Sequence, residues 1–91
     1  MLIEFDPAKN ARNIASRGLS FERAEEFDFE TATYRPDKRR DYGEERIRAF
    51  GYLDQRVHCL VFVAIEGGIR VISFRKANAR EVKRHEHETQ S

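Results

Sequence analysis

The stretch that most constrains the fold is residues 57–77, VHCLVFVAIEGGIRVISFRKA, in which two apolar runs flank a Glu-Gly-Gly step at 66–68. Apolar runs on either side of paired glycines predict a β-hairpin, because glycine readily takes the positive φ of a tight turn. The first run is apolar at every position over 59–65. A strand that is apolar on both faces is usually central and covered on both sides. The hairpin therefore predicts the middle of a layered sheet.

Length and composition predict one small globular domain, residues 1–91. The chain is 40% hydrophobic and 36% charged, unlike a disordered chain. Cys59 is the only cysteine, which excludes an intramolecular disulfide, and its mid-strand position predicts a buried, unreactive thiol. The first residues lack the basic start and apolar stretch of a signal peptide, and no apolar run approaches the ~18 residues that span a bilayer. We therefore expect a cytoplasmic protein with no membrane partner.

Two helices are predicted before the hairpin. The dipeptide Asp6-Pro7 favours a helix start and Gly18 a helix end, so the first helix covers 7–17. A serine cap predicts a second helix over 20–28. The side chains expected to face the core are Ala8, Ala11, Ile14 and Ala15 in the first helix and Phe21, Ala24 and Phe27 in the second.

The remaining elements complete an α+β fold. Strands are predicted at 2–5, 31–35 and 46–53, with a charged loop over 36–45. A last helix begins after Asn78, and an acidic residue three positions later resembles a capping box. Nothing in this helix is apolar beyond residue 82, so its last turns are expected to be weakly held. Consecutive hairpins predict a mainly antiparallel sheet, packed with two amino-terminal helices and one carboxy-terminal helix.

Charge is unevenly distributed along a chain whose net charge is only +1. Residues 22–30 carry five acidic and one basic side chain, whereas residues 69–85 carry six basic and one acidic. A basic region on a nearly neutral protein suits a polyanion or an acidic partner. A merely solvated, charged surface is the alternative interpretation of the same pattern.

One strand face is predicted to be both cationic and aromatic. Arg46, Arg48, Phe50 and Tyr52 alternate with small or aliphatic residues in the strand before the hairpin. A phosphate or a nucleotide base can rest on such a face, although arginines also stack over rings on ordinary exposed surfaces. Two further cations, Arg75-Lys76, follow the buried part of the last strand. They are the first indication of an anion site.

The sequence lacks the signatures of several chemistries. It has no Gly-rich phosphate loop, no CxxC pair and no visible serine triad, and His85 and His87 are spaced wrongly for metal ligands on one helix face. We therefore expect no metal and no cofactor. The Arg, Lys, Glu and His side chains that remain are expected to converge where three elements meet. These are the strand that starts at Arg46, the strand that ends at Arg75-Lys76 and the helix that starts at Asn78.

Such a set of side chains suits RNA cleavage without a metal. The 2′-hydroxyl must lose a proton, the pentavalent phosphorane gains negative charge, and the 5′-oxygen must gain a proton. Clustered guanidinium groups stabilise the phosphorane. A His, Glu or Lys of suitable pKa transfers the protons. Composition alone does not single out this reaction.

The order and spacing of short motifs carry a family resemblance over nearly the whole chain. The motifs are Phe5-Asp6-Pro7-Ala8-Lys9, Asn13, Gly18-Leu19-Ser20-Phe21, Ala24, Asp37, Gly43-Glu44-Glu45-Arg46, Gly51, Ile69-Arg70-Val71-Ile72-Ser73, Arg75-Lys76-Ala77 and Arg80-Glu81. In this pattern the chain resembles the BrnT family of type II toxins, small ribonucleases with a RelE-like fold. The resemblance implies an endoribonuclease that halts translation. It also implies a BrnA-like antitoxin partner with a ribbon-helix-helix part, through which alone the toxin would be linked to DNA.

The resemblance also guides the assignment of site residues. Arg46 and Arg75 are assigned to stabilise the phosphorane. Further catalytic candidates are Glu45, Lys76, Arg80 and His85, with Glu81 as a weaker one that also fits a purely capping role. The RNA-binding candidates are Lys9, Arg48, Tyr52 and Lys83.

Two positions depart from the family pattern. The first helix commonly ends with a histidine before its glycine, where this chain has Arg17. The last helix commonly carries a tyrosine near its end, where this chain has His85. A histidine can replace a tyrosine as acid or base with a pKa nearer neutrality. A neutral surface substitution is the alternative.

Two other functions stay open at this point. A non-catalytic module that binds RNA or a protein through the same cationic face would carry similar residues. A DNA-binding regulator acting alone is a third possibility, but no predicted helix pairs a helix-turn-helix spacing with a run of base-reading side chains. Substitution of Arg46 and Arg75 separates an enzyme from a binding module, because only an enzyme has cleavage to lose.

Overall fold

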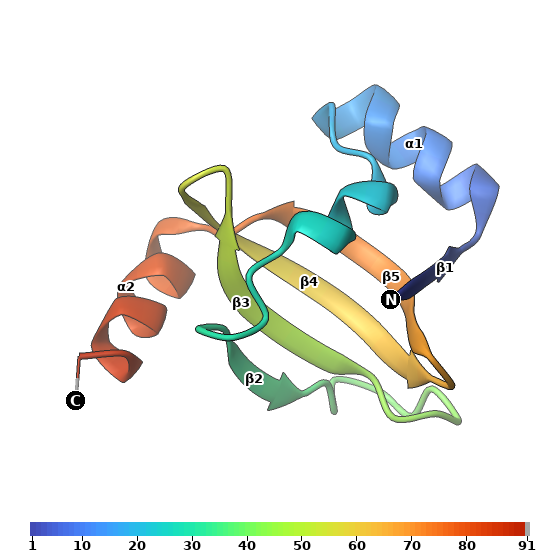
Figure 1. Ribbon diagram of the computed structural model, residues 1–91. Helices are drawn as coiled ribbons and strands as arrows, with labels where there is room; N and C mark the ends of the chain where they lie inside the picture. Colours follow the sequence, from blue (N-terminus) through green and yellow to red (C-terminus); the bar gives the residue numbers. More distant parts are fainter. Residues whose placement is uncertain (91) are drawn as a thin grey trace.

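The computed structural model describes residues 1–90, which form an α+β fold around one five-stranded sheet (Figure 1). In chain order the elements are β1 (Leu2–Phe5), α1 (Pro7–Arg17), the 3₁₀ helix η1 (Phe21–Glu26), β2 (Thr33–Pro36), β3 (Ile47–Leu53), β4 (Arg56–Ile65), β5 (Gly68–Lys76) and α2 (Ala79–Glu88). The predicted α+β class is confirmed. The predicted elements are all present in the predicted order, although the second helix is of another type.

The strands lie in the order β1-β5-β4-β3-β2, so β4 is central, as its two apolar faces predict. Three pairings are antiparallel: β2 with β3, β3 with β4, and β4 with β5. The fourth pairing, of β1 with β5, is parallel. The sheet is therefore mixed, and the prediction of a mainly antiparallel sheet did not foresee this edge. A parallel pair needs a long connection, and here most of the chain separates the two strands.

Buried side chains form one cluster on each face of the sheet. The larger cluster contains Leu19, Phe21, Ala24, Phe27, Ala49, Leu53, Leu60, Phe62, Ile69, Val71 and Phe74. The smaller cluster contains Phe50, Val57, Cys59, Val61 and Ala77, with Ile72 and Val82 packed against it. η1 covers the first cluster and α2 the second, and β4 contributes to both. The buried position predicted for Cys59 is confirmed, since it is 1% exposed.

η1 takes the place of the α-helix predicted over 20–28. Phe21, Ala24 and Phe27 are nevertheless buried, at 2%, 0% and 4% exposure. A three-residue repeat keeps side chains on one face of a 3₁₀ helix, which has three residues per turn, whereas it drifts around an α-helix. The apolar spacing therefore predicted the buried face correctly and the helix type wrongly.

α1 buries a polar residue instead of its apolar ones. Ala8, Ala11, Ile14 and Ala15 are all exposed, Ile14 at 45%, whereas Asn13 is 6% exposed. The Asn13 Nδ2 atom donates to the backbone oxygens of Leu19 and Phe74, each at 2.9 Å. These two hydrogen bonds turn the asparagine face toward the sheet. The predicted core-facing side of α1 is therefore wrong.

α2 extends further than predicted and is anchored to its last turn. The capping box is present, with reciprocal hydrogen bonds between Asn78 and Glu81. His85 is 1% exposed, and Glu88 accepts a hydrogen bond from Arg35 of β2 at 2.6 Å. The anchors are polar, which explains why an apolar pattern did not find them. None of the described helices is long and apolar enough to cross a membrane.

The two glycines where β4 turns into β5 serve different purposes. Gly67 has a φ of +80°, as expected for a tight turn. Gly68 lies opposite Leu2 in the parallel pair, and a Cβ atom on it would sit 1.9 Å from the Leu2 backbone oxygen. Gly68 is therefore required for the close approach of β1, and the expectation of positive φ at both glycines is wrong for it.

We predict that Gly68→Ala destabilises the protein by about 3 kcal/mol, because β1 must move away from β5. Gly43→Ala is the control, since Gly43 has a positive φ, unlike Gly68, but no atom within 4 Å of its added Cβ. That control should lose only ~1 kcal/mol, from backbone strain. Urea unfolding measures both values. Equal losses in the two variants would contradict the role assigned to Gly68.

Candidate functional site

The residues predicted to converge lie toward opposite ends of the sheet. β3 and β5 both run antiparallel to β4, so they are parallel to each other and start at the same end. Arg75, near the end of β5, is level with Phe50 of β3 through Cys59. Phe50 lies four residues, or ~13 Å, further along the chain than Arg46. The expected meeting of Arg46 with Arg75 is therefore wrong, because it overlooked the direction of the strand between them.

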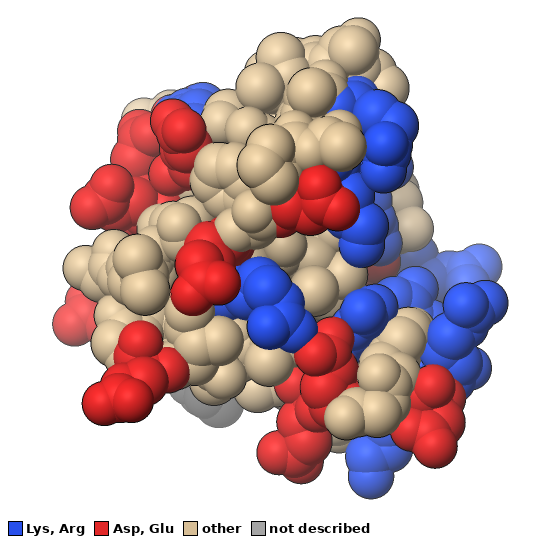
Figure 2. All heavy atoms as spheres, turned by 90° about the vertical axis from the view of Figure 1, so that its right-hand side faces the viewer, with Lys and Arg blue, Asp and Glu red and all other residues tan. Residues whose placement is uncertain are grey.

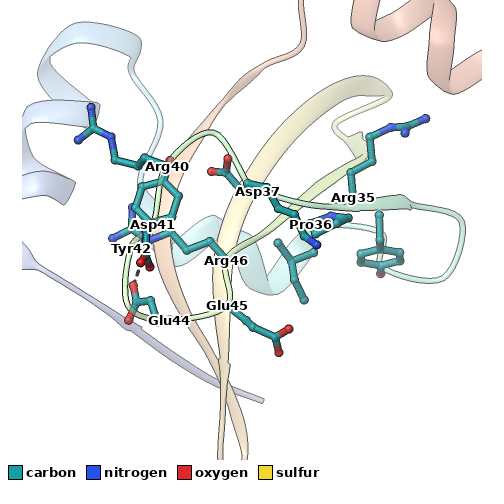
Figure 3. A pocket seen from close by; sticks show the side chains of 12 residues that line it. Arg35, Pro36, Asp37, Arg40, Asp41, Tyr42, Glu44, Glu45 and Arg46 are labelled. Carbon is teal, nitrogen blue, oxygen red and sulfur yellow. Dashed lines mark hydrogen bonds and ion pairs between the residues drawn. The ribbon is translucent and has the colours of Figure 1, made fainter.

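Arg46 lies in a pocket of about 590 Å³ beside the loop between β2 and β3 (Figure 3). Its Nε donates to a carboxylate oxygen of Glu44 at 3.0 Å, and its guanidinium lies 4.1 Å from the centre of the Tyr42 ring. Glu44 also accepts a hydrogen bond from Arg70 of β5. Glu45 points away from this pair (Figure 3). The charge of Arg46 is therefore already compensated, and Glu45 is not part of that compensation.

Arg75 lies where β5 leads into α2, on the face covered by α2. Its two terminal nitrogens donate to the two carboxylate oxygens of Glu81 at 2.8 and 2.9 Å. Glu81 also accepts the backbone N–H of Asn78 at 2.9 Å. The guanidinium of Arg75 lowers the pKa of Glu81, so this carboxyl is ionised at neutral pH. A planar ion pair is thus fixed between β5 and the start of α2.

Arg48 of β3 lies on the same face of the sheet. Its ladder partner is Val61, which belongs to the cluster covered by α2. Within residues 1–90 Arg48 forms no ion pair, and its Nε is sealed from solvent without a hydrogen-bond partner. Its charge contributes to the lowered pKa of Glu81. The face near the Arg75–Glu81 pair therefore carries one cation that no carboxylate neutralises directly.

Asp37 and Arg39 form a further ion pair near Arg48. The Asp37 side chain is 1% exposed and accepts from the Arg39 Nε at 2.7 Å. A second bond joins the other carboxylate oxygen to the Arg39 Nη2 at 2.8 Å. These hydrogen bonds lower the pKa of Asp37 to about 2, and the charge of Arg48 adds a smaller effect. The family motifs include Asp37, but the sequence did not predict that its side chain is buried.

His85 lies in a pocket of about 230 Å³ between α2 and the strands β2 and β3. Its Nδ1 lies 3.1 Å from the hydroxyl oxygen of Thr33, and its ring packs edge-on against Tyr52, with centroids 5.6 Å apart. The Nε2 atom is sealed from solvent and has no partner among the described residues. His85, predicted to be catalytic, is therefore buried on the side of α2 that faces the sheet, where a substrate cannot reach it in this arrangement.

The remaining predicted residues are exposed but scattered. Arg80 and Lys83 project from α2, and Lys76 ends β5, so these three surround the start of α2. Tyr52 is 38% exposed and lies against His85. Lys9 lies on α1, beside a separate hollow of about 230 Å³. Arg80 and Lys83 therefore lie on the helix that also holds Glu81, the partner of Arg75, whereas Lys76 projects from the other face of the sheet and Lys9 lies apart.

A larger pocket, of about 600 Å³, lies at the end of the sheet where β3 turns into β4 and β5 ends. Its lining includes Arg17, Arg56, His58, Arg75 and Lys76. Sequence reasoning missed Arg56 and His58 as site residues. Arg56 and His58 stand two residues apart at the start of β4, so the sequence alone could have placed them on one face of the strand. The strand was instead interpreted from the apolar run that follows them.

Charged side chains are unevenly distributed over the face of the molecule in Figure 2. Seen from the right-hand side of Figure 1, basic groups lie mostly along the right flank, whereas acidic groups lie at the upper left and also in the centre and along the bottom of the view (Figure 2). Across the top, where α1 lies, the surface is largely uncharged (Figure 2).

No group of three His, Cys, Asp or Glu side chains within the described part of the chain could hold a metal ion.

Comparison with protein-family models decides the family. The model described as "Ribonuclease toxin, BrnT, of type II toxin-antitoxin system" matches residues 5–81. The chain belongs to this family. A comparison with curated proteins gave no match. The resemblance seen in the sequence is thus confirmed, and membership in the BrnT family implies an RNA substrate and an antitoxin partner.

The matched region takes in the Arg75–Glu81 pair, Arg48 and the pocket that holds His58. It ends at Glu81, so most of α2, including Arg84 and His85, lies outside it. BrnT membership therefore says nothing about the buried histidine under α2. The roles of individual residues are taken up below as proposals.

We predict that Asp37 makes stability pH-dependent. Its pKa in the folded protein is about 2, below the ordinary 3.8, so its contribution is present above pH 3.8 and is lost as the pH falls toward 2. Asp37→Asn should reduce stability at neutral pH and flatten the fall in the free energy of unfolding on acidification. Glu25→Gln, at an exposed position, is the control and should leave the pH profile unchanged. Identical profiles for wild type and Asp37→Asn would rule out the paired carboxylate.

Proposed function

We propose that this chain is an endoribonuclease toxin that cleaves RNA without a metal ion and thereby stops translation. The observation that carries the proposal is the arrangement at the start of α2. There Arg75 is held by Glu81, and Arg48 on the same face has no acidic partner within residues 1–90. A guanidinium without a carboxylate is free to bind a phosphate, and a second one, oriented by Glu81, lies on the same face of the sheet.

The reaction needs charge stabilisation more than covalent chemistry. The phosphorane formed by attack of the 2′-hydroxyl carries extra negative charge on its equatorial oxygens. An arginine that is fixed before the substrate arrives, as Arg75 is, stabilises that charge without reorganising. Glu81 is ionised and bidentate to Arg75, so it holds the guanidinium plane in one orientation. Arg75 and Arg48 are therefore the proposed phosphorane-binding residues, with Glu81 as a positioning residue.

The exposed cations around α2 suit the rest of the RNA strand. Arg80 and Lys83 project into solvent from α2, the helix that holds Glu81, and would contact flanking phosphates. Arg46, with Tyr42 stacked against it, lies too far along the sheet for the same phosphate. We therefore propose Arg46 and Glu45 for contacts with a more distant nucleotide, and no longer for the cleavage step. Tyr52 and Lys9 would be peripheral contacts.

The partner proposed for this toxin is a BrnA-like antitoxin with a ribbon-helix-helix part. A basic surface that binds RNA in the free toxin can bind acidic side chains of the antitoxin in the complex, which would block cleavage. The antiparallel strands with α2 packed on one face support the RelE-like fold that the resemblance implies. We further propose that residues 1–91 act as one toxin domain in the cytoplasm, where its RNA substrates are.

A non-catalytic binding module is the second candidate, and one observation favours it. Both arginines first assigned to catalysis are paired with carboxylates, and His85 is sealed under α2. A module that only binds RNA or a protein needs no exposed acid or base. Cleavage by the purified chain separates the two functions.

We predict that Arg75→Ala lowers the rate of RNA cleavage by about 100-fold or more, because one phosphorane-binding guanidinium is lost. Cleavage of total RNA by purified protein measures the rate, and growth of a bacterial host after induction measures toxicity. Arg12→Ala, at an exposed position on α1, is the control and should keep both effects. Normal growth and intact RNA with folded wild-type protein would favour the binding module instead.

We predict that cleavage continues in an excess of EDTA. The proposed reaction draws on guanidinium and proton-transfer groups, so removing divalent ions should change the rate less than about 2-fold once ionic strength is matched. A ribonuclease that needs magnesium, assayed in parallel, should lose its activity. Loss of cleavage by the toxin in EDTA and its return on adding Mg²⁺ would overturn the metal-free mechanism.

A further inference from the structure

The pocket at the end of β4 and β5 contains a histidine that the proposed function has not used. His58 is 5% exposed and lines this pocket of about 600 Å³. Its partner in the antiparallel ladder is Lys76, so the two side chains project from the same face of the sheet. Arg56 lies two residues before His58 on β4 and lines the same pocket. An imidazole thus lies among cations at an open end of the sheet.

Hydrogen bonding fixes which ring nitrogen of His58 carries the proton. Nδ1 lies 2.8 Å from the backbone oxygen of Arg56. A carbonyl oxygen only accepts, so Nδ1 is the donor, and the neutral ring keeps its lone pair on Nε2. Nε2 has no hydrogen-bond partner among residues 1–90 and, unlike Nε2 of His85, is not sealed from solvent. His58 therefore offers a proton acceptor to whatever occupies the pocket.

The surroundings of His58 favour its neutral form. Burial lowers its pKa below the ordinary 6.5, and the charges of Arg56 and Lys76 lower it further. The hydrogen bond to the Arg56 backbone and the charge of Asp54 act in the opposite direction. The charged groups around the ring are Arg17 of α1, Arg23 of η1, Asp54 of the β3–β4 turn, Arg56 of β4, and Arg75 and Lys76 of β5. The ring is thus an unprotonated base at neutral pH within a cationic rim.

Three of these cations are available to an anion. Arg17, Arg56 and Lys76 are exposed, and none forms an ion pair with another described residue. Arg23, in contrast, is bonded to both carboxylate oxygens of Asp54, at 2.7 and 2.8 Å. Asp54, the acidic residue that lines the pocket, is therefore already paired with Arg23. A phosphate in the pocket would meet guanidinium and ammonium groups beside a free imidazole nitrogen.

We propose that His58 is the general base of RNA cleavage, and that Arg17, Arg56 and Lys76 hold the scissile phosphate. This inference rests on the proposed ribonuclease function. Nε2 of His58 takes the proton of the 2′-hydroxyl, the 2′-oxygen bonds to phosphorus, and the bond from phosphorus to the 5′-oxygen breaks. The leaving oxygen takes a proton from water. The products are a 2′,3′-cyclic phosphate on one fragment and a 5′-hydroxyl on the other.

Arg75 connects this pocket to the site at the start of α2. It lines the pocket, and its guanidinium is bonded to Glu81 of α2. Arg75 thus belongs to both sites, although its guanidinium is turned toward Glu81 on the α2 face. The base is on one side of the strand end and the oriented guanidinium on the other. The inference therefore extends the proposed site to a second face of the sheet.

Substitution of two histidines, one inside the pocket and one outside it, tests whether His58 is the general base. His58→Gln should lower the rate of cleavage of a labelled oligonucleotide by about 100-fold or more, a loss typical of a removed general base. It should also abolish the fall in rate below the pKa of His58, where wild-type His58 becomes protonated. His87→Gln, at an exposed position on α2 outside the pocket, should match wild type. The wild-type fragments should end in a 2′,3′-cyclic phosphate.

A second measurement does not depend on cleavage. Titration with inorganic phosphate, followed by NMR of the histidine rings, should shift the His58 signals and raise its pKa, and leave His87 unchanged. The combined variant Arg17→Ala/Arg56→Ala should abolish that shift. If Arg75→Ala is inactive but folded His58→Gln cleaves at the wild-type rate, the inference fails and the proposed function stands. If wild type leaves RNA intact, the proposed function fails. If phosphate then also fails to shift the His58 signals, the assignment of the pocket as a phosphate site fails as well.

Discussion

The burial of β4 on both faces is the constraint on which the rest of the structure depends. A strand with apolar residues in both directions is stable only when each face is covered. η1 and the residue that follows it cover one face with Phe21, Ala24 and Phe27, and α2 covers part of the other with Val82. The sheet is therefore placed between two unlike layers. The candidate site lies where these layers end and the cations of β3, β4 and β5 emerge.

Polar groups, rather than apolar ones, fix the outer elements on this core. Asn13 joins α1 to the loop before η1 and to β5 through two hydrogen bonds. Glu81 joins α2 to β5 and caps its own helix. Buried polar links of this kind define one arrangement, because a shift of one residue would leave the groups unpaired. They also explain why the ends of β5 and α2 are ordered enough to orient an arginine.

The sequence predicted most of the fold because its strands and caps follow local rules. The hairpin, the central strand, the Asp6 and Asn78 caps and the buried face of η1 all came from spacing within short segments. The parallel pairing of β1 was not predictable in this way, because it depends on the close approach that Gly68 permits across the whole chain. The exposed alanines of α1 and the buried His85 were missed for a related reason. Each depends on one long-range hydrogen bond or contact that no periodic pattern records.

The candidate site was predicted in part. The sequence indicates the cations at Arg75-Lys76, because two charges follow a buried strand, and the family resemblance indicates Arg75 and Glu81. The supposed proximity of Arg46 failed because strand direction is a property of the assembled sheet. His58 was overlooked because it precedes a continuous apolar run, and only the position of the Arg56 backbone shows which of its nitrogens is free. Chemistry that depends on a tautomer becomes visible only in three dimensions.

The pairing of β1 with β5 has a consequence for the order of folding. β2, β3, β4 and β5 each pair with a neighbour in the chain, whereas β1 and β5 are separated by most of the described residues. Closing a long loop costs more conformational entropy than closing a short one, so pairs that are distant in the sequence form late. We therefore expect the antiparallel strands to assemble first and β1 to join the sheet afterwards, at the edge where Gly68 admits it.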